Sequence, residues 1–297
     1  MPIPESQLET WSHQGSVVQS ATTYQSVKRA LEAGTTIYRN RNFQVFLQGS
    51  YGNDTNIFAE SDVDVVIRYD DAFFHDLSAL PQDQQSAFTA HFKDVDYTYA
   101  KFKSDVEAGL VSAFGNSVKA GQKAIEIAAN GSRRSSDVIV AFEFRRYLRF
   151  NGTTDQNFDS GICFFRTDGT RIANYPKQHS ANCTAKHQTT GSNFKPLVRI
   201  LKNLRGRLVE TGKLAEGVAP SYFIEGLLYN VPNEHFAGNY GEMFVACVRW
   251  LNQQTDRTKW VCANEQYYLL GDDPVCWPAD SCQKFIDAVI AAWNGWE

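Results

Sequence analysis

An apolar run that carries two aspartates constrains this chain more than any other feature. Asp62 and Asp64 flank Val63, and Val65-Val66-Ile67 continues the run. Because the side chains of a strand alternate between its two faces, both carboxylates lie on one face, while Val63 and Val65 lie on the other, toward a core. Burial of each carboxylate beside aliphatic side chains costs on the order of several kcal/mol unless a cation compensates. The pattern therefore predicts a metal site on a β-strand.

The chemistry expected of this pair depends on magnesium. Mg²⁺ prefers oxygen ligands, keeps several waters and is bound through one or two carboxylates together with substrate phosphates. Gly49-Ser50 precedes the pair and follows another apolar run, Phe43 to Leu47. A glycine at a strand-to-helix turn lets backbone N–H groups and the serine hydroxyl approach a phosphate closely. We therefore expect metal and phosphate sites side by side, with a nucleoside triphosphate as the substrate.

A third carboxylate on a neighbouring strand would complete a site for two Mg²⁺ or Mn²⁺ ions, which clamp the attacking and leaving oxygens of a phosphoryl displacement. Asp137 is the candidate, since it begins an apolar run after the hairpin signal Asn130-Gly131. Glu143 on the same strand is the alternative ligand. The alternative role for Asp137 is to cap the strand or to pair with Arg133 or Arg134.

Composition and charge narrow the class of protein. The chain has 297 residues, of which 43% are hydrophobic and 13% aromatic, as in an ordered globular protein. It has no run of about 20 apolar residues and no leader-like N-terminus, so we expect a cytoplasmic enzyme without a membrane span. The net charge is −4, whereas a protein that binds duplex nucleic acid is expected to be basic. Six scattered cysteines form no Cys-x-x-Cys motif and are expected to be reduced.

The order of elements predicts two lobes. A helix over 14–32 leads into the strands just described, and further strands follow until Tyr175. After that residue the periodicity becomes helical, with strong helices over 194–211 and 221–229. We therefore expect a core domain over residues 1–175 and a helical lobe over residues 176–297.

The motifs together resemble a known superfamily. Gly49-Ser50, Asp62-Val63-Asp64 and Asp137 are similar to the polymerase-β-like nucleotidyltransferases. The segments from Tyr175 to His179, Asn193 to Arg205 and Pro220 to Glu225 are similar to their CD-NTase branch, the cGAS/DncV-like nucleotidyltransferases. The resemblance implies an α/β (α+β) fold, in which a nucleotidyltransferase core with a small mixed sheet is joined to a C-terminal helical lobe and the active site lies in the cleft between them.

The implied activity is synthesis of a cyclic oligonucleotide. Two or possibly three purine nucleoside triphosphates, with ATP and GTP expected, are joined with release of pyrophosphate, for example into a cyclic GMP–AMP. In the family the product is a second messenger of bacterial anti-phage (CBASS-type) signalling. The implied partners are a separate product-sensing effector and ancillary proteins that modify the C-terminus, while double-stranded DNA is not required. The same triad also fits transfer to an RNA, protein or small-molecule acceptor, and a catalytically silent nucleotide sensor is the non-enzymatic alternative.

The basic helix supplies candidate nucleotide contacts. Lys195, Arg199 and Lys202 share one helix face and present a cationic stripe suited to a polyphosphate. By resemblance, Lys202 and Ser221 contact the donor triphosphate, with Arg199 as the competitor of Lys202, and Tyr222 stacks on a nucleobase. The structural alternatives are an N-cap role for Ser221 and a core position for Tyr222.

Two further sets of side chains are expected to lie outside the site. Arg205 and Arg207 of the same helix are predicted to be solvated or to form ion pairs. His179, Cys183 and His187 have no fourth ligand at a recognisable spacing, so no zinc site is predicted there.

Overall fold

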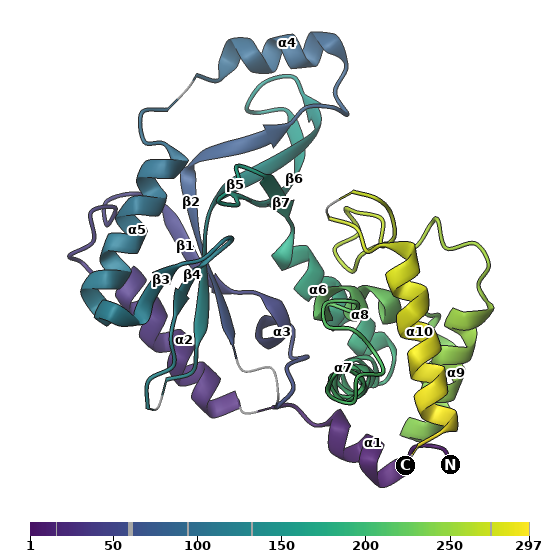
Figure 1. Ribbon diagram of the computed structural model, residues 1–297. Coiled ribbons are helices and arrows are strands. Elements are labelled where there is room, and N and C mark those ends of the chain that lie inside the picture. Colours follow the sequence, from purple (N-terminus) through teal and green to yellow (C-terminus); the bar gives the residue numbers. More distant parts are fainter. Residues whose placement is uncertain (16, 59–61, 94, 132, 274, 297) are drawn as a thin grey trace. The chain divides into compact units, whose positions relative to one another are not determined.

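A computed structural model describes residues 1–15, 17–58, 62–93, 95–131, 133–273 and 275–296. The chain divides into two compact units, both built from separate stretches of sequence (Figure 1). We call Val18–Gln48 together with Asp62–Pro176 the sheet unit. Met1–Val17, Gly49–Ser61 and Lys177–Glu297 make up the helical unit.

The described residues of the sheet unit form one mixed sheet of seven strands. The order is β1-β2-β5-β4-β3, with β6 paired to β5 and β7 paired to β6. Only the β2–β5 pair among these is parallel, so the chain must cross over between them. The strands are β1 (Phe43–Leu47), β2 (Val63–Asp76), β3 (Val118–Ala120), β4 (Ile125–Ile127), β5 (Ser136–Phe150), β6 (Gln156–Phe165) and β7 (Arg171–Asn174). The accompanying helices are α2 (Val17–Leu31), α4 (Gln82–His91), α5 (Tyr99–Phe114) and the 3-10 turn η1 (Gly115–Ser117).

The two faces of the sheet are packed differently. On one face, Val63, Val65 and Ile67 are buried in a cluster to which α2 and α5 contribute (Figure 1). On the other face, Val66 of β2 packs in a smaller cluster with Ile139 of β5. Because side chains alternate along a strand, Asp64 shares the face of Val66, and Asp137 shares the face of Ile139. Asp64 and Asp137 therefore lie on the face that α2 and α5 do not cover.

Strands β2 and β5 are longer than their apolar runs predict. Their pairing continues past an irregularity between Tyr69 and Phe73 to Asp76 and Arg146. The extension is aromatic, and it packs against α4 in a cluster that includes Phe88 and Tyr147. Charged residues such as Asp70, Asp71, Arg145 and Arg146 interrupt the apolar runs, so these runs predicted shorter strands.

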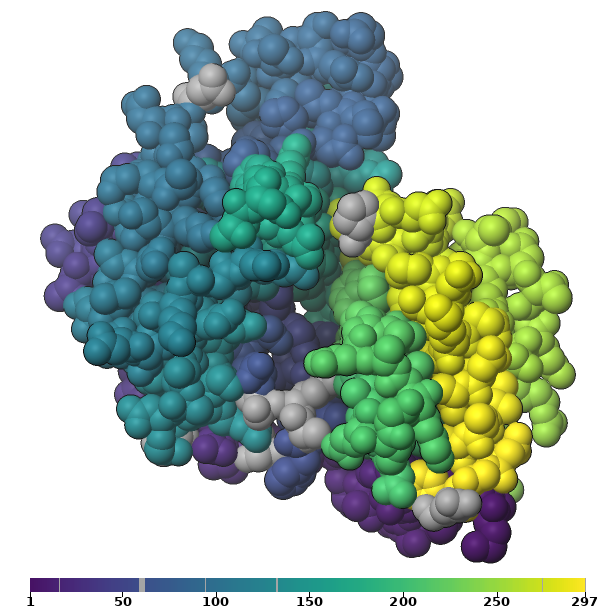
Figure 2. All heavy atoms as spheres, viewed as in Figure 1, coloured from purple at the N-terminus to yellow at the C-terminus, as the bar shows by residue number. Residues whose placement is uncertain are grey.

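The helical unit is organised around α7. Nine residues of this helix are buried, and its apolar face joins α1, α8, α9 and α10 in one core. Helices α9 and α10 lie side by side at the surface of the unit (Figure 2). No helix in the described part of the chain is long and apolar enough to cross a membrane. The elements are α1 (Glu5–Ser12), α3 (Gly49–Gly52), α6 (Pro176–Thr189), α7 (Phe194–Glu210), α8 (Ser221–Tyr229), η2 (Asn233–His235), α9 (Tyr240–Gln253) and α10 (Ala279–Asn294).

The units differ from the predicted domains in two segments. The predicted boundary after residue 175 lies next to the division between Pro176 and Lys177. Residues 1–17 and 49–61, however, group with the helices rather than with the sheet. The reason is packing, since Ile3 and Leu8 are buried in the helical core and the chain around Thr55 is bound by side chains of α7 and α8.

Candidate active site

Two of the three predicted aspartates lie on neighbouring strands of the sheet unit, and the third directly precedes one of these strands. Asp64 is directly opposite Asp137 in the parallel register of β2 and β5. Asp62 precedes β2, where the Val63 N–H donates to the Ser135 carbonyl at 3.1 Å and the Ser135 hydroxyl donates to the Asp62 carboxylate. Side chains directly opposite each other on neighbouring strands point to the same face of the sheet. The strand arrangement expected for the triad is therefore present.

The electrostatics of this group are those of a cation site. Asp137 is half-buried, and its pKa is raised first by burial and then by the negative charges of Asp62 and Glu126. Glu126 on β4 faces Asp137 in the antiparallel register, and the sequence analysis assigned it no role. Carboxylates gathered on one face repel one another, so a divalent cation bound there would lower their energy. The donor set consists of hard oxygens and therefore fits Mg²⁺ or Mn²⁺.

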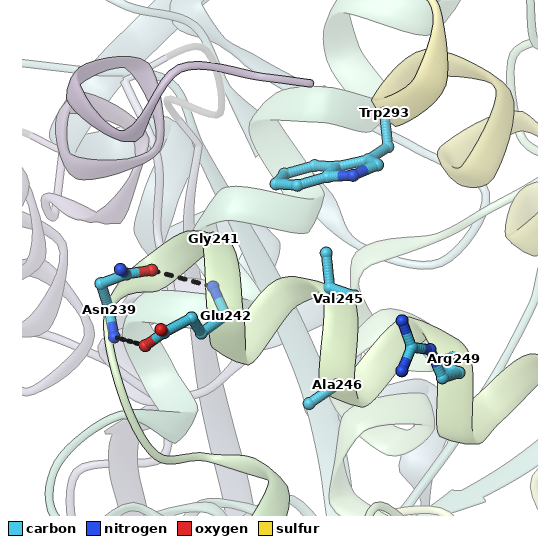
Figure 3. Close-up of a pocket in the computed structure, with 7 residues that line it drawn as sticks. All are labelled: Asn239, Gly241, Glu242, Val245, Ala246, Arg249 and Trp293. Atoms are coloured by element: carbon cyan, nitrogen blue, oxygen red, sulfur yellow. Dashed lines mark hydrogen bonds between the residues drawn. The ribbon is translucent and has the colours of Figure 1, made fainter. Parts of the chain in front are cut away.

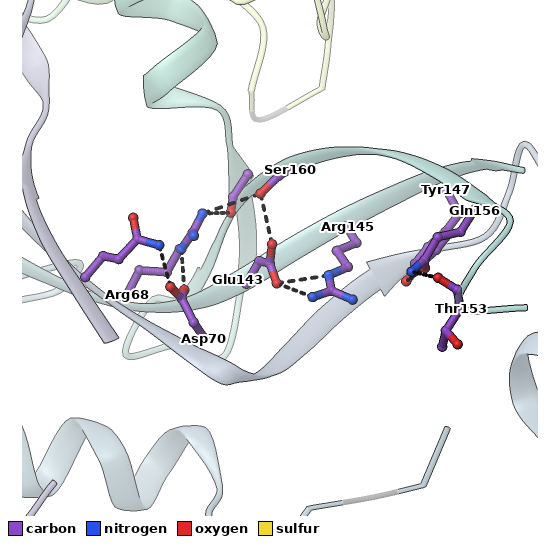
Figure 4. Close-up of polar contacts among 10 residues, drawn as sticks. Arg68, Asp70, Glu143, Arg145, Tyr147, Thr153, Gln156 and Ser160 are labelled. Carbon is purple, nitrogen blue, oxygen red and sulfur yellow. Dashed lines mark hydrogen bonds and ion pairs between the residues drawn. The ribbon is translucent and has the colours of Figure 1, made fainter. Parts of the chain in front are cut away.

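The alternative third ligand, Glu143, is engaged elsewhere (Figure 4). Its carboxylate accepts hydrogen bonds from the Arg145 guanidinium at 2.7 and 2.9 Å and from the Ser160 hydroxyl at 3.1 Å. It also lies six residues beyond Asp137 on β5, which corresponds to about 20 Å along the strand. Glu143 therefore belongs to a structural ion pair, and Asp137 is the third carboxylate of the candidate site.

The two arginines considered as partners of Asp137 make other contacts. The Arg133 guanidinium lies over the Phe114 ring and donates to the Ala128 carbonyl. The Arg134 guanidinium contacts the Ser20 hydroxyl at 3.3 Å.

The cationic stripe predicted on α7 exists, but it binds the protein itself. Lys195 Nζ is 3.0 Å from Asp54 Oδ2, Arg199 Nη1 is 2.6 Å from the Asp54 carbonyl, and Lys202 Nζ is 2.9 Å from the Thr55 carbonyl. All three cations thus hold the segment that follows Gly49-Ser50. Lys202, expected to contact a triphosphate, has no exposed surface in this structure. The pattern predicted the shared helix face but not what that face packs against.

The Gly49-Ser50 turn has the strand-to-helix geometry expected of it. Gly49 has a φ of +67°, which disfavours any residue with a side chain, and it begins the one-turn helix α3. The Asn53 N–H donates to the Gly49 carbonyl at 3.1 Å, and the Thr55 N–H donates to the Ser50 carbonyl at 2.9 Å. The conformation of Gly49 and Ser50 is therefore tied to the positions of Asn53 and Thr55.

A buried carboxylate on α8, Glu225, received no role in the sequence analysis. It accepts hydrogen bonds from Asn53 Nδ2 at 3.0 Å and from the Thr55 hydroxyl, and it lies 2.6 Å from His179 Nε2 on α6. Burial by itself raises the pKa of Glu225, but the hydrogen bond and charge of His179, the charge of Lys202 and the bond from Thr55 outweigh it and lower the pKa. Glu225 is therefore a carboxylate held in its charged form inside the helical unit.

Ser221 and Tyr222 open α8. Pro220 occupies the N-cap position, so the alternative N-cap role for Ser221 is wrong, and Ser221 is the first helical residue. The Tyr222 ring stacks on the His179 ring with centroids 4.7 Å apart, and its hydroxyl accepts a hydrogen bond from Asn264 Nδ2 at 2.9 Å. Tyr222 also packs against the helical core, so its position is fixed by packing whatever else it contacts.

Of the two arginines predicted to be solvated or ion-paired, Arg207 is exposed and Arg205 is not. Arg207 is exposed, with its guanidinium over the Trp296 ring. Arg205 is half-buried and donates to the Ala219 carbonyl at 2.8 Å.

One other cluster brings together potential metal ligands. His179, Cys183 and Glu225 are buried, with ligand atoms within 4.8 Å of one another. The Glu225 oxygens already accept hydrogen bonds, the charge of Lys202 is close by, and burial and Glu225 raise the pKa of the Cys183 thiol well above its usual value. A protonated thiol and a neighbouring ammonium group disfavour the binding of a divalent metal ion at this cluster. His187, the third residue of the predicted set, lies apart and accepts from the Lys195 N–H.

A shallow hollow lies on the surface between α9 and α10 (Figure 3). Trp293 of α10 faces Val245 of α9 across it, and Ala246 and Arg249 of α9 also line it. Asn239 and Glu242 close one end, where they form the capping box that begins α9. None of the predicted site residues lines this hollow.

Comparison with known proteins identifies the family. Residues 181–294 match the model of the cGAS/DncV-like nucleotidyltransferase C-terminal helical domain. A cyclic UMP-AMP synthase from Rhodothermus marinus is 37% identical over 298 residues, which cover 100% of this chain and 99% of that protein. A cyclic dipurine nucleotide synthase from Elizabethkingia meningoseptica is 37% identical over 81% of each chain.

The fold agrees with this relationship. The structure of the Rhodothermus marinus CdnE c-UMP-AMP synthase with Apcpp and Upnpp superposes with a TM-score of 0.89 at 36% identity, and covers 99% of this chain and 98% of that one. The predicted mixed α/β core with a C-terminal helical lobe is thereby confirmed, as is the predicted class of enzyme. The chain belongs to the cGAS/DncV-like nucleotidyltransferases, the CD-NTase family.

Proposed function

We propose that this nucleotidyltransferase is a cyclic dinucleotide synthase that joins two nucleoside triphosphates and releases pyrophosphate as each bond forms. The observation that carries the proposal is the opposition of Asp64 and Asp137 on parallel strands, with Asp62 one residue before β2. The relatives named as cyclic nucleotide synthases support it, because two of them are related to this chain over most of its length.

The proposed reaction is an in-line displacement at phosphorus. A ribose hydroxyl of one nucleotide attacks the α-phosphorus of the other, the new P–O bond forms, and the bond to the pyrophosphate breaks. Asp62, Asp64 and Asp137 would hold two divalent ions, Mg²⁺ or Mn²⁺. Such ions lower the pKa of the attacking hydroxyl and stabilise the charge on the leaving group.

The other predicted residues supply binding and orientation. We assign the triphosphate to the Gly49-Ser50 turn. The segment that follows this turn is held by α7, since Arg199 and Lys202 donate to the carbonyls of Asp54 and Thr55. Ser221 remains the proposed second phosphate contact, and Tyr222 the proposed base platform, because its ring is already oriented by His179 and Asn264. Arg199, which is only partly buried, replaces Lys202 as the proposed cation nearest to the phosphates.

The choice of bases belongs to this proposal. The name of the Rhodothermus marinus relative includes AMP and UMP, and the name of the Elizabethkingia relative specifies two purines. We propose ATP as one substrate, with the predicted purine GTP as its partner. A cyclic GMP–AMP is the product expected from the sequence, and UTP and CTP are the competitors to be tested.

Purified protein incubated with the four labelled nucleoside triphosphates and Mg²⁺ or Mn²⁺ tests the proposal. A phosphatase-resistant cyclic product, identified by mass spectrometry and absent from the Asp62→Ala/Asp64→Ala double variant, is the expected result. Label in a macromolecule instead would favour transfer to an acceptor. Nucleotide binding without turnover would favour a silent sensor.

The predicted cellular role extends the proposal. We place the enzyme in the cytoplasm of a bacterium, in CBASS-type anti-phage signalling, with a separate effector that senses the cyclic product and ancillary proteins that modify its C-terminus. Co-expression of the enzyme with a product-responsive effector, followed by phage challenge, tests this role. Protection that disappears in the Asp62→Ala/Asp64→Ala double variant is the expected result.

A further inference from the structure

Glu225 connects two parts of the helical unit that the proposed function assigns to one nucleotide. On one side it accepts hydrogen bonds from the Asn53 amide and the Thr55 hydroxyl. On the other side Glu225 contacts His179 Nε2 at 2.6 Å. The His179 ring in turn stacks on the ring of Tyr222. A single carboxylate, 2% exposed, therefore touches both the segment behind the Gly49-Ser50 turn and the residue behind the proposed base platform.

Movement of Asn53 or Thr55 would be transmitted to the turn. The N–H groups of these two residues donate to the carbonyls of Gly49 and Ser50. Their side chains donate to Glu225. Each residue thus has one bond to the turn and one to the carboxylate, and both residues are at most 5% exposed, so water cannot readily replace the carboxylate.

The charges around Glu225 make this arrangement rigid. Lys202 carries a fully buried ammonium group, donates to the Thr55 carbonyl and lowers the pKa of Glu225 by its charge. Removal of Glu225 would take away a negative charge that interacts with this buried cation. The carboxylate and the ammonium therefore hold Thr55 from two directions, through its hydroxyl and its carbonyl.

We propose that Glu225 is a positioning residue that fixes the Gly49-Ser50 turn relative to Tyr222, and so sets the spacing between the phosphate and base contacts of the bound nucleotide. The inference rests on the proposed function. Glu225 has no part in the chemical step, because its carboxylate is buried and its oxygens are engaged by the protein.

Three substitutions at buried threonines test the inference in the full-length enzyme. Thr55→Val keeps the volume of the side chain and removes the hydroxyl that donates to Glu225. Thr55→Ser removes the methyl group and keeps the hydroxyl. Thr190→Val is the matched control, since this buried threonine bonds to the Lys186 carbonyl and the Phe194 N–H and, within the described part of the chain, makes no hydrogen bond to Glu225 or to residues 49–55.

The expected result separates positioning from packing. Thr55→Val should raise the KM for nucleoside triphosphate about tenfold, because a hydrogen bond to a charged group is lost. Thr55→Ser should restore the KM to within about twofold of the wild-type value, and Thr190→Val should leave it unchanged at a similar loss of thermal stability. Hydrogen exchange of the amides of residues 50–55 should be faster in Thr55→Val than in Thr55→Ser.

Two outcomes would overturn the inference. If Thr55→Ser is impaired as much as Thr55→Val, the side chain matters through packing rather than through its bond to Glu225. If Thr55→Val has a wild-type KM, the carboxylate does not position the turn. Absence of cyclic product from the wild-type enzyme is a different result, since it refutes the proposed function itself and the inference with it.

Discussion

Asp64 on β2 and Asp137 on β5 lie directly opposite each other in a parallel strand pair. In such a pair the chain runs the same way in both strands, so residues near the start of each strand meet at one edge of the sheet. The segment between them, which includes α4 and α5, makes the crossover. This topology brings distant carboxylates to one place without a long loop.

The proposed triad can be tested against its nearest alternative. Asp64→Asn and Asp137→Asn should each lower the rate of nucleotide joining by about 10³-fold, because loss of a metal ligand forfeits on the order of 4 kcal/mol of transition-state stabilisation. Glu143→Gln, which breaks the ion pair with Arg145, should retain most of the activity. Initial rates at saturating Mg²⁺ measure the difference. Equal losses in Asp137→Asn and Glu143→Gln would contradict the assignment.

Asp137→Asn should also stabilise the metal-free protein. The pKa of Asp137 is raised in the folded state by burial and by Asp62 and Glu126, so its ionisation disfavours folding once the pH exceeds its ordinary pKa. At pH 7 with a chelator, the variant should be more stable by about 0.5 kcal/mol, the size of a like-charge cross-strand pair. The advantage should disappear as the pH falls toward 3.8, where the wild-type side chain is protonated as well. Urea unfolding across this range measures it, and a variant less stable at pH 7 would refute the argument.

Lys202→Met should lower the free energy of unfolding by about 3 kcal/mol, because it removes a buried charge that stabilises the Glu225 carboxylate and the donor to the Thr55 carbonyl. Lys213→Met, at an exposed lysine just beyond α7, should change it by less than about 0.5 kcal/mol. Denaturant unfolding compares the two. Similar stability in both variants would show that the buried ammonium group has no structural role.

Glu225→Gln should show its effect through pH. The pKa of Glu225 is lowered in the folded state, so its charge stabilises the fold above its ordinary pKa of 4.5 and this contribution is lost as the pH falls through the lowered value. The stability difference between wild type and Glu225→Gln should therefore be constant near neutral pH, at about 3 kcal/mol, and should shrink below pH 4.5. Thermal unfolding of both proteins between pH 3 and 8 measures this difference. A difference that does not change with pH would contradict the prediction.

Tyr222→Ala should weaken nucleotide binding by about 10-fold, as expected for the loss of one base–aromatic stack. Tyr222→Phe keeps the ring against His179 and loses only the bond from Asn264, so its affinity should stay within about threefold of the wild-type value. Titration with a non-hydrolysable triphosphate compares them. If Phe is as harmful as Ala, the hydroxyl rather than the ring makes the contact.

Local patterns predicted much of this fold. The alternation around Asp64 predicted the face on which it lies, and the apolar run after Asp137 predicted the strand beside it. Asp62 was predicted on the same strand but precedes its first residue. Helix α8 has the predicted limits, since Pro220 and Pro232 bracket an unbroken apolar segment.

The partners of buried charges were not predictable in the same way. Thr55 and Glu225 are separated by 170 positions, and periodicity states which face a residue occupies but not what covers that face. For this reason Lys202 was predicted to meet a phosphate, whereas it meets the Thr55 carbonyl. Glu126 was missed because its importance arises from its register opposite Asp137, which a short strand does not reveal.

The short excursion between β1 and β2 has a consequence for dissecting the enzyme. Gly49–Ser61 groups with helices that follow more than a hundred residues later, although both flanking strands belong to the sheet unit. A fragment that starts at Lys177 would retain Glu225, Lys195 and Lys202 and lack Asn53, Asp54 and Thr55. Lys195 would then have lost its contact with Asp54, and Lys202 and Glu225 would have lost their hydrogen bonds to Thr55 and Asn53. Because the helical unit includes residues 49–61, a cut at Lys177 is a poor choice for separate expression or domain exchange.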